Sequence, residues 1–303
     1  ALTVLVYPGL LFGVALVLAG EWTLNALRPS LTPRIYRSPA HAYRLLQPFF
    51  NFLKMAGRQP AAGVGLAPAP RSDRLVRSSL AFASALAPVL ALALLPFPGR
   101  PSARSLESVG DLFLVLALLA AHPLCKALLR LSGDRGALRG ALDLGRLVTG
   151  LFPILVAVGA LLEASADKSL RMEPLLAAPE TPAQALVRLL AGVALLVALP
   201  WWLDWRGPGV DALEDAGTYA GGLLQRAALA GFWAVVVLPT PGELPWAVTV
   251  AVGGTIAAYV ALQIVSERWA PGAREAAAAR LVWATSLPVA MVAMLAALLW
   301  AGA

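Results

Sequence analysis

The residue with the clearest chemical potential in this sequence is Arg226, which lies inside a long apolar segment. It falls about seven residues into the stretch 219–239, too deep to belong to a loop. A guanidinium at such a depth is costly unless it faces an opposite charge or water. We therefore expect it to face acids one or two turns away or another protein chain. A side chain that snorkels to the membrane surface is the alternative.

Acidic residues gather just before that segment. Asp211, Glu214 and Asp215 are three and four residues apart, so on a helical turn they would share one face. Two interpretations stay open for them: a charged funnel opposite the basic residues of an earlier loop, or an ordinary solvated loop.

A second charged group surrounds Asp143. Arg139 precedes it by four residues and Arg146 follows it by three, so either arginine would neutralise it on one helix face. Such a pair is structural, and it contributes only a few tenths of a kcal/mol where it is exposed.

The composition indicates what must position these charges. Hydrophobic residues make up 59% of the chain and charged residues 14%, with a mean hydropathy of +0.74. That is more apolar surface than a soluble domain could bury. Apolar runs of about 20 residues recur, and each must satisfy its own backbone hydrogen bonds in lipid, so each is expected to be a helix. The sequence predicts an all-α integral membrane protein with one membrane domain, 1–303. The eight expected spans are 3–20, 78–96, 109–129, 147–166, 184–203, 219–239, 246–266 and 281–301.

The basic residues predict the orientation of these spans. Counted from the N-terminus, the odd-numbered loops carry most of the arginines and lysines, and the even-numbered loops carry few. By the positive-inside rule the odd loops face the cytoplasm and both termini lie on the opposite side. The formal charge of +7 then follows from topology, and no nucleic-acid partner is expected.

Metal and redox chemistry are not expected within this chain. Cys125 is its single cysteine, which excludes an iron–sulfur centre or structural zinc built from this chain alone. His41 and His122 are far apart and form no metal-ligand pattern. His122 lies in an apolar run, and we interpret it as a packed, hydrogen-bonded core residue.

The segment 43–58 has a narrow polar stripe and a broad apolar surface. Its polar residues recur three and four apart, with mostly Leu, Phe, Met or Ala between them. This pattern predicts an amphipathic helix in the membrane interface, within a long first cytoplasmic loop, 21–77. The stripe consists of Arg44, Gln47, Asn51, Lys54 and Arg58.

Several fragments resemble one family of membrane subunits. LLQPFFNFLK, 45–54, is similar to the LLQPxxDxxKL motif of the subunit that anchors the quinone-reaction module of respiratory complex I (NuoH), and to the related HycD-type subunit of group 4 membrane-bound hydrogenases. Glu21 with Ala26 resembles the family's ERKxxA opening. The remaining similar fragments follow in the family's order: GALRGALDLGRLVTGLFP at 136–153, DWRGPGVDALEDAGTYAGG at 204–222 and ARLVWATSLP at 279–288.

The resemblance implies partner subunits in the inner membrane of a prokaryote. These are peripheral iron–sulfur and hydrogenase-like large subunits, which hold the redox centres, and antiporter-like membrane subunits. It also admits a quinone near the interfacial helix. The implied quinone-entrance or docking residues are Arg34, Gln47, Pro48, Asn51 and Lys54. The candidate charge-relay residues are Glu21, Arg139, Asp143, Arg146, Asp204, Asp211, Glu214, Asp215, Tyr219 and Arg226.

The sequence departs from the family at its coupling carboxylates. A glutamate in low dielectric can pass on a proton when a nearby charge changes, and this is the role attributed to the family's membrane acids. The residues that replace them here carry no proton themselves, which points away from a quinone-reducing enzyme. They are Asn51, Leu147, Val148, Thr218 and Gly231.

The sequence thus predicts a non-catalytic anchor and coupling subunit of a complex I-like or group 4 hydrogenase-like assembly. Two alternatives stay open. One is a stand-alone permease or exporter that uses Arg226 and the acids of 204–215 as its path. The other is a structural scaffold that has lost its proton-relay carboxylates.

Overall fold

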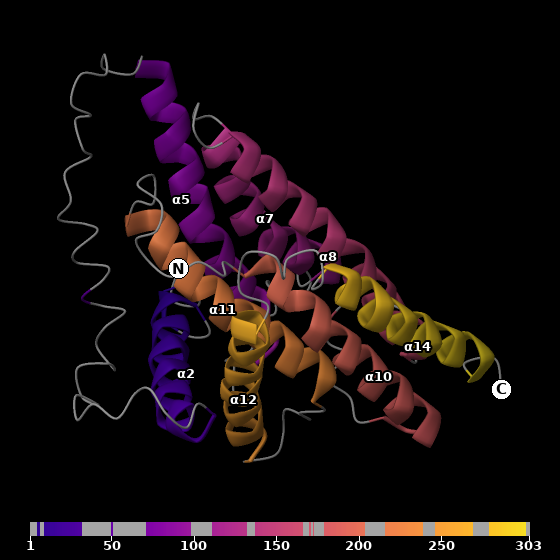
Figure 1. Cartoon of the computed structure of the whole chain (residues 1–303). Helices are drawn as coiled ribbons and strands as arrows, with labels where there is room; N and C mark the ends of the chain where they lie inside the picture. The colour runs from indigo at the N-terminus through magenta and orange to yellow at the C-terminus, as the bar shows by residue number, and fades with distance from the viewer. Residues whose placement is uncertain are drawn as a thin grey trace.

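The computed structural model describes residues 5–6, 9–31, 50, 71–97, 111–131, 137–165, 170, 172, 179–203, 216–238, 246–268 and 279–300. Over these residues the chain has the architecture of an all-α integral membrane protein (Figure 1). Eight described segments are long and apolar enough to cross a membrane, which confirms the sequence prediction. The elements are α2 Leu10–Leu31, α5 Arg71–Leu94, α7 Leu112–Leu131, α8 Ala137–Ala164, α10 Pro182–Ala198, the 3₁₀ turn η1 Leu199–Trp202, α11 Ala216–Val237, α12 Ala247–Arg268, the π turn η2 Val282–Ser286 and α14 Leu287–Trp300.

Helix α11 lies at the centre of the bundle. It packs against α2, α5, α7, α10 and α12. Its span is 67% buried, against 28% for the spans of the first and last helices. Ala227, Ala228 and Ala230 in its middle are fully buried. Small side chains let neighbouring helices approach closely, which is how helices associate in lipid.

The other helices extend from α11 in two directions. On one side α12 contacts α11 and then α2, and these two lie side by side in Figure 1. On the other side α5 packs on α7, α7 on α8, and α8 on both α10 and α14. A polar group on α11 can therefore reach either side of the bundle.

Prolines interrupt the hydrogen bonding of several spans. Pro88 lies inside α5, Pro123 inside α7 and Pro153 inside α8. Each lacks an N–H, so the carbonyl four residues earlier loses its helical donor. The last span contains a π turn just before Pro288, where the Leu287 N–H bonds the Val282 carbonyl. Freed carbonyls inside a membrane need donors from neighbouring helices.

The start of α10 follows directly from its sequence. Thr181 accepts a hydrogen bond from the Gln184 N–H at 3.2 Å, and Gln184 accepts one from the Thr181 N–H at 3.3 Å. Pro182 occupies the first helical position, where no donor is required. This reciprocal capping box fixes the beginning of the fifth span.

The predicted end of the first span and the predicted start of the fourth are wrong, and both errors have the same cause. The first helix runs over Leu10–Leu31 instead of 3–20, so Glu21 lies within it. The fourth helix begins at Ala137, well before the predicted start at 147, and includes Asp143. Both acids are bonded by arginines, so they do not end the apolar helices in which they lie.

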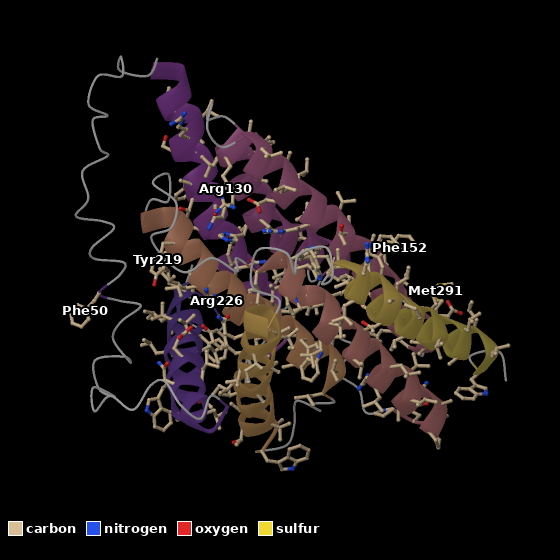
Figure 2. The ribbon with its side chains drawn as sticks, viewed as in Figure 1. Phe50, Arg130, Phe152, Tyr219, Arg226 and Met291 are labelled. Atoms are coloured by element: carbon tan, nitrogen blue, oxygen red, sulfur yellow. The ribbon has the colours of Figure 1, made fainter. Side chains whose placement is uncertain are left out.

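The predicted first loop, 21–77, overlaps helices at both of its ends. The first helix continues to Leu31 and the second begins at Arg71. The predicted interfacial helix, 43–58, lies outside the described residues apart from Phe50, which is helical and 51% exposed (Figure 2).

Gly20→Ala should destabilise the protein, because Gly20 is where α2 meets α12. A Cβ atom there would lie 2.7 Å from Cγ of the buried Tyr259 ring. A Gly→Ala change within a helix is normally favourable by about 0.5–1 kcal/mol, whereas overpacking costs about 1–3 kcal/mol. Gly253→Ala is the matched control, since nothing lies within 4 Å of its added Cβ. Thermal unfolding in detergent should show a lower midpoint for the Gly20 variant only, and equal midpoints would contradict this packing.

Candidate functional site

The charge at Arg226 is balanced by a residue from the first span. Its Nη1 lies 3.3 Å from Glu21 Oε1, and the Tyr259 hydroxyl donates to the same oxygen at 2.9 Å. Arg226 and Glu21 are 18% and 14% exposed, and Tyr259 is buried. Figure 2 places Arg226 where α11 meets α2 and α12. A buried ion pair needs additional hydrogen bonds to offset its desolvation, and Tyr259 provides one.

A second ionic group joins α7 to α8. The Asp143 carboxylate accepts hydrogen bonds from Arg130 and, at 3.1 Å, from Arg146. The pairing of Asp143 with Arg146 is the one that their spacing predicts. Arg130 is a partner that the sequence did not indicate, since it comes from the preceding helix and is 7% exposed. The side chain of Arg139, the other predicted partner, lies outside the described residues.

A small pocket adjoins this group. Its volume is about 30 Å³, enough for about two water molecules at roughly 10–15 Å³ each. The Trp202 indole N–H donates to the Leu147 carbonyl at 3.3 Å and thereby fixes η1 against α8. Water held there would touch both ionic and neutral polar groups. The lining residues are His122, Pro123, Lys126, Arg130, Asp143, Arg146, Trp201, Trp202 and Leu203.

Two buried side chains bond the carbonyls that prolines have freed. Pro88 removes the helical donor for the Ser84 carbonyl, and His122 Nδ1 lies 3.0 Å from that oxygen and 2.8 Å from the Ser84 hydroxyl. Pro123 removes the donor for the Leu119 carbonyl, to which Gln225 Nε2 donates at 2.7 Å. A buried carbonyl without a partner costs about 1–3 kcal/mol, so both bonds stabilise the bundle.

Close helix contact makes the first of these bonds geometrically feasible. A Cβ atom on Gly221 would lie 2.6 Å from the Ser84 carbonyl oxygen and 2.9 Å from His122 Nδ1. The glycine therefore lets α11 press against α5 and α7 at the imidazole. Gln225, one turn further along α11, is 1% exposed, and no donor among the described residues reaches its Oε1.

These groups lie at successive helix contacts: those of α2 and α12 with α11, of α11 with α5 and α7, and of α7 with α8. Gln225 and Arg226 are neighbours on α11 that reach opposite sides of the bundle, to α7 and α2 respectively. We name this series the polar seam. It consists of Glu21, Ser84, His122, Lys126, Arg130, Asp143, Arg146, Gln225, Arg226 and Tyr259.

The structure brings together part of the predicted relay. It joins Glu21 to Arg226 and Asp143 to Arg146, and Tyr219 is buried on α11 two turns before Arg226. The acids Asp204, Asp211, Glu214 and Asp215 lie outside the described residues. So do all the predicted docking residues, Arg34, Gln47, Pro48, Asn51 and Lys54.

Several members of the polar seam escaped prediction. Tyr259 and Arg130 gave no sign of their partners, which lie on other helices, and Lys126 gave no sign that it lines the pocket. Ser84 could have been found from Pro88, because a proline inside a span identifies the carbonyl four residues earlier as needing a donor. The prediction that His122 is a packed, hydrogen-bonded core residue is confirmed, since it is 2% exposed and bonds Ser84.

Comparison with known proteins gives one finding on the fold. No known family profile and no curated protein matches this chain. Among solved structures, it is similar to a chain in the structure of the membrane-bound sulfane sulfur reductase (MBS), an archaeal respiratory membrane complex. The TM-score is 0.68 at 18% identity, and the match covers 95% of this chain and 97% of the other. The two chains therefore share a fold along nearly their whole lengths. The finding does not single out the NuoH or HycD-type subunits that the sequence fragments resemble.

Glu21→Gln should destabilise the isolated protein, because it removes the carboxylate that Arg226 and Tyr259 bond. Breaking a buried pair from one side costs about 3–5 kcal/mol, whereas removing both charges is often close to neutral. The double variant Glu21→Gln/Arg226→Gln should therefore be more stable than Glu21→Gln alone. The unfolding free energies of the original chain, the two single variants and the double variant give the interaction energy between Glu21 and Arg226. If the effects of the two single substitutions simply add, the pair contributes nothing to stability.

Gln225→Leu should destabilise the protein by about 1–3 kcal/mol, because it leaves the Leu119 carbonyl without its donor. In a Pro123→Ala background, the restored backbone N–H can bond that carbonyl, so the same substitution should cost much less. The measurement is a double-mutant cycle on unfolding free energy. An equal cost in both backgrounds would contradict the role of Pro123.

Proposed function

We propose that this chain is the membrane anchor and coupling subunit of a complex I-like or group 4 hydrogenase-like assembly. The observation that carries the proposal is the fold shared with a chain of a respiratory membrane complex, over 95% of one chain and 97% of the other. The ordered motifs at 45–54, 136–153, 204–222 and 279–288 support it independently of the fold.

In this proposal the chain does no electron chemistry itself. Peripheral iron–sulfur and hydrogenase-like large subunits on the cytoplasmic face hold the redox centres, and antiporter-like subunits in the prokaryotic inner membrane move the ion. Arg34 and the polar stripe of 43–58, including Gln47 and Lys54, form the docking side of the subunit. The absence of the family's carboxylates at Asn51 and Gly231 favours an assembly that does not reduce a quinone.

The polar seam supports the coupling part of the proposal. Charged groups inside a membrane protein are expensive, and they commonly mark a path for ions or protons. Here Glu21 on α2 pairs with Arg226 on α11, and Asp143 on α8 pairs with Arg130 on α7, so each acid is neutralised by an arginine from another helix. Long-range transmission between such pairs requires an element with two discrete arrangements whose equilibrium both pairs bias.

Purification of the tagged chain in mild detergent tests the assembly directly. Mass spectrometry of the eluate should identify antiporter-like subunits, an iron–sulfur protein and a hydrogenase-like large subunit, together with iron by elemental assay. An unrelated multi-pass protein carrying the same tag is the control. An iron-free eluate that contains only this chain, even after crosslinking, would overturn the proposal and favour a stand-alone permease.

Asp143→Asn in the assembled complex should lower ion-coupled turnover by roughly 10²-fold, the scale on which proton-transfer groups act. It should also lower the stability of the subunit, because it leaves Arg130 and Arg146 without their carboxylate. Glu180→Gln is the matched control, because it makes the same kind of chemical change at an exposed position next to the α10 cap. Turnover and native subunit stoichiometry are measured on the same preparation. Full turnover in the Asp143 variant would indicate a structural scaffold.

A further inference from the structure

Three cationic side chains line the pocket between α7, α8 and η1. Lys126 and Arg130 are buried and come from the last two turns of α7, and Arg130 is labelled in Figure 2. Arg146 of α8 is partly buried. Asp143 is the one acid among the described residues of this lining. The described lining therefore carries more positive than negative charge.

The bonds to Asp143 use only part of what these cations can donate. Asp143 accepts from one nitrogen of Arg130 and one of Arg146, whereas each guanidinium has several N–H donors in a planar fork. All three cations also take part in other interactions. The site needs no idle cation, because a guanidinium or ammonium can bond more than one acceptor at the same time.

The pocket lies where two of the spans end. Leu131 ends α7, and Trp202 ends the apolar segment Pro182–Trp202. The loops that follow are the third and fifth, for which the positive-inside rule predicts a cytoplasmic location. Basic pockets between spans on that side of a membrane bind the phosphate-bearing head groups of lipids. The position of this pocket therefore suits a phosphate group.

We propose that this pocket binds a phosphate group, which Lys126, Arg130 and Arg146 hold by charge-assisted hydrogen bonds. The forked donors of arginine match two phosphate oxygens, and lysine adds a compact charge. A volume of about 30 Å³ admits two water-sized groups, so two phosphate oxygens can enter while the rest of the molecule stays at the mouth. The head group of an anionic phospholipid or inorganic phosphate supplies this group. The site is a property of this chain and does not rest on the proposed function.

Thermal unfolding of the full chain, purified in detergent and freed of lipid, separates the two sources. One arm adds phosphatidylglycerol, with diacylglycerol, which lacks the phosphate, as its control. The other adds sodium phosphate, with sodium chloride at equal ionic strength as its control. A ligand of the folded chain raises the unfolding midpoint once its concentration exceeds its Kd. A rise in the first arm alone assigns the site to lipid, and a rise in the second alone assigns it to free phosphate. No rise in either arm would overturn the proposal.

Lys126→Gln tests the location of the site. It removes one charge from the lining, so the Kd obtained from the midpoint shifts should rise tenfold or more, the value of about one hydrogen bond to a charged group. Arg280→Gln is the matched control, because it removes one positive charge at an exposed position outside the lining. An equal Kd in the original chain and in both variants would overturn the proposal.

Photocrosslinking uses the unaltered chain, so its result does not depend on how well a variant folds. A short alkyl phosphate that carries a diazirine should label peptides containing residues 122–130 or 201–203. An excess of the phosphate compound that raised the unfolding midpoint should reduce this labelling. Labels confined to other segments would overturn the proposal. A structure of the assembled complex in which an acidic side chain of another subunit fills the pocket, with no phosphate bound, would overturn it as well.

Discussion

In the hydrocarbon core of a membrane, every backbone polar group must find its partner within the protein, and the interior of this bundle is organised by that requirement. Pro88 and Pro123 each free a carbonyl in a spanning helix. His122 and Gln225 bond these carbonyls from neighbouring helices. The two helical hydrogen bonds missing from α5 and α7 are thereby replaced by two hydrogen bonds between helices. These bonds fix both helices in register with the rest of the bundle.

The same requirement applies with greater force to charges. The pairs Arg130–Asp143 and Glu21–Arg226 each join two helices, and Tyr259 adds a third helix to the second pair. The central helix α11 contributes Arg226 to the contact with α2 and Gln225 to the contact with α7. A protein that only needed to be stable could fill these positions with apolar residues at little cost. Buried charges inside a membrane protein commonly mark a path for ions or protons, and here they lie beside a pocket of about 30 Å³.

Hydropathy predicts the number of spans because apolar length is a local property of the sequence. It misplaces the end of the first helix and the start of the fourth because it treats Glu21 and Asp143 as loop acids. The partner of Glu21 is 205 residues away, and no spacing rule reaches that far. Local spacing did indicate the Asp143–Arg146 pair, which lies within one helix. The bond from His122 to Ser84 spans two helices, and only the proline four residues after Ser84 gives a sign of it.

We propose that this chain acts within a multi-subunit assembly and that its polar seam is satisfied by its own residues. A cryo-EM reconstruction of the particle, purified through the tagged chain from its native membrane, tests both parts at once. We expect additional subunits around the eight spans, with Arg226 paired to Glu21 and His122 hydrogen-bonded to Ser84 inside this chain. A solitary chain with a water-filled path between α11 and α7, and with Arg226 turned towards that path, would contradict it.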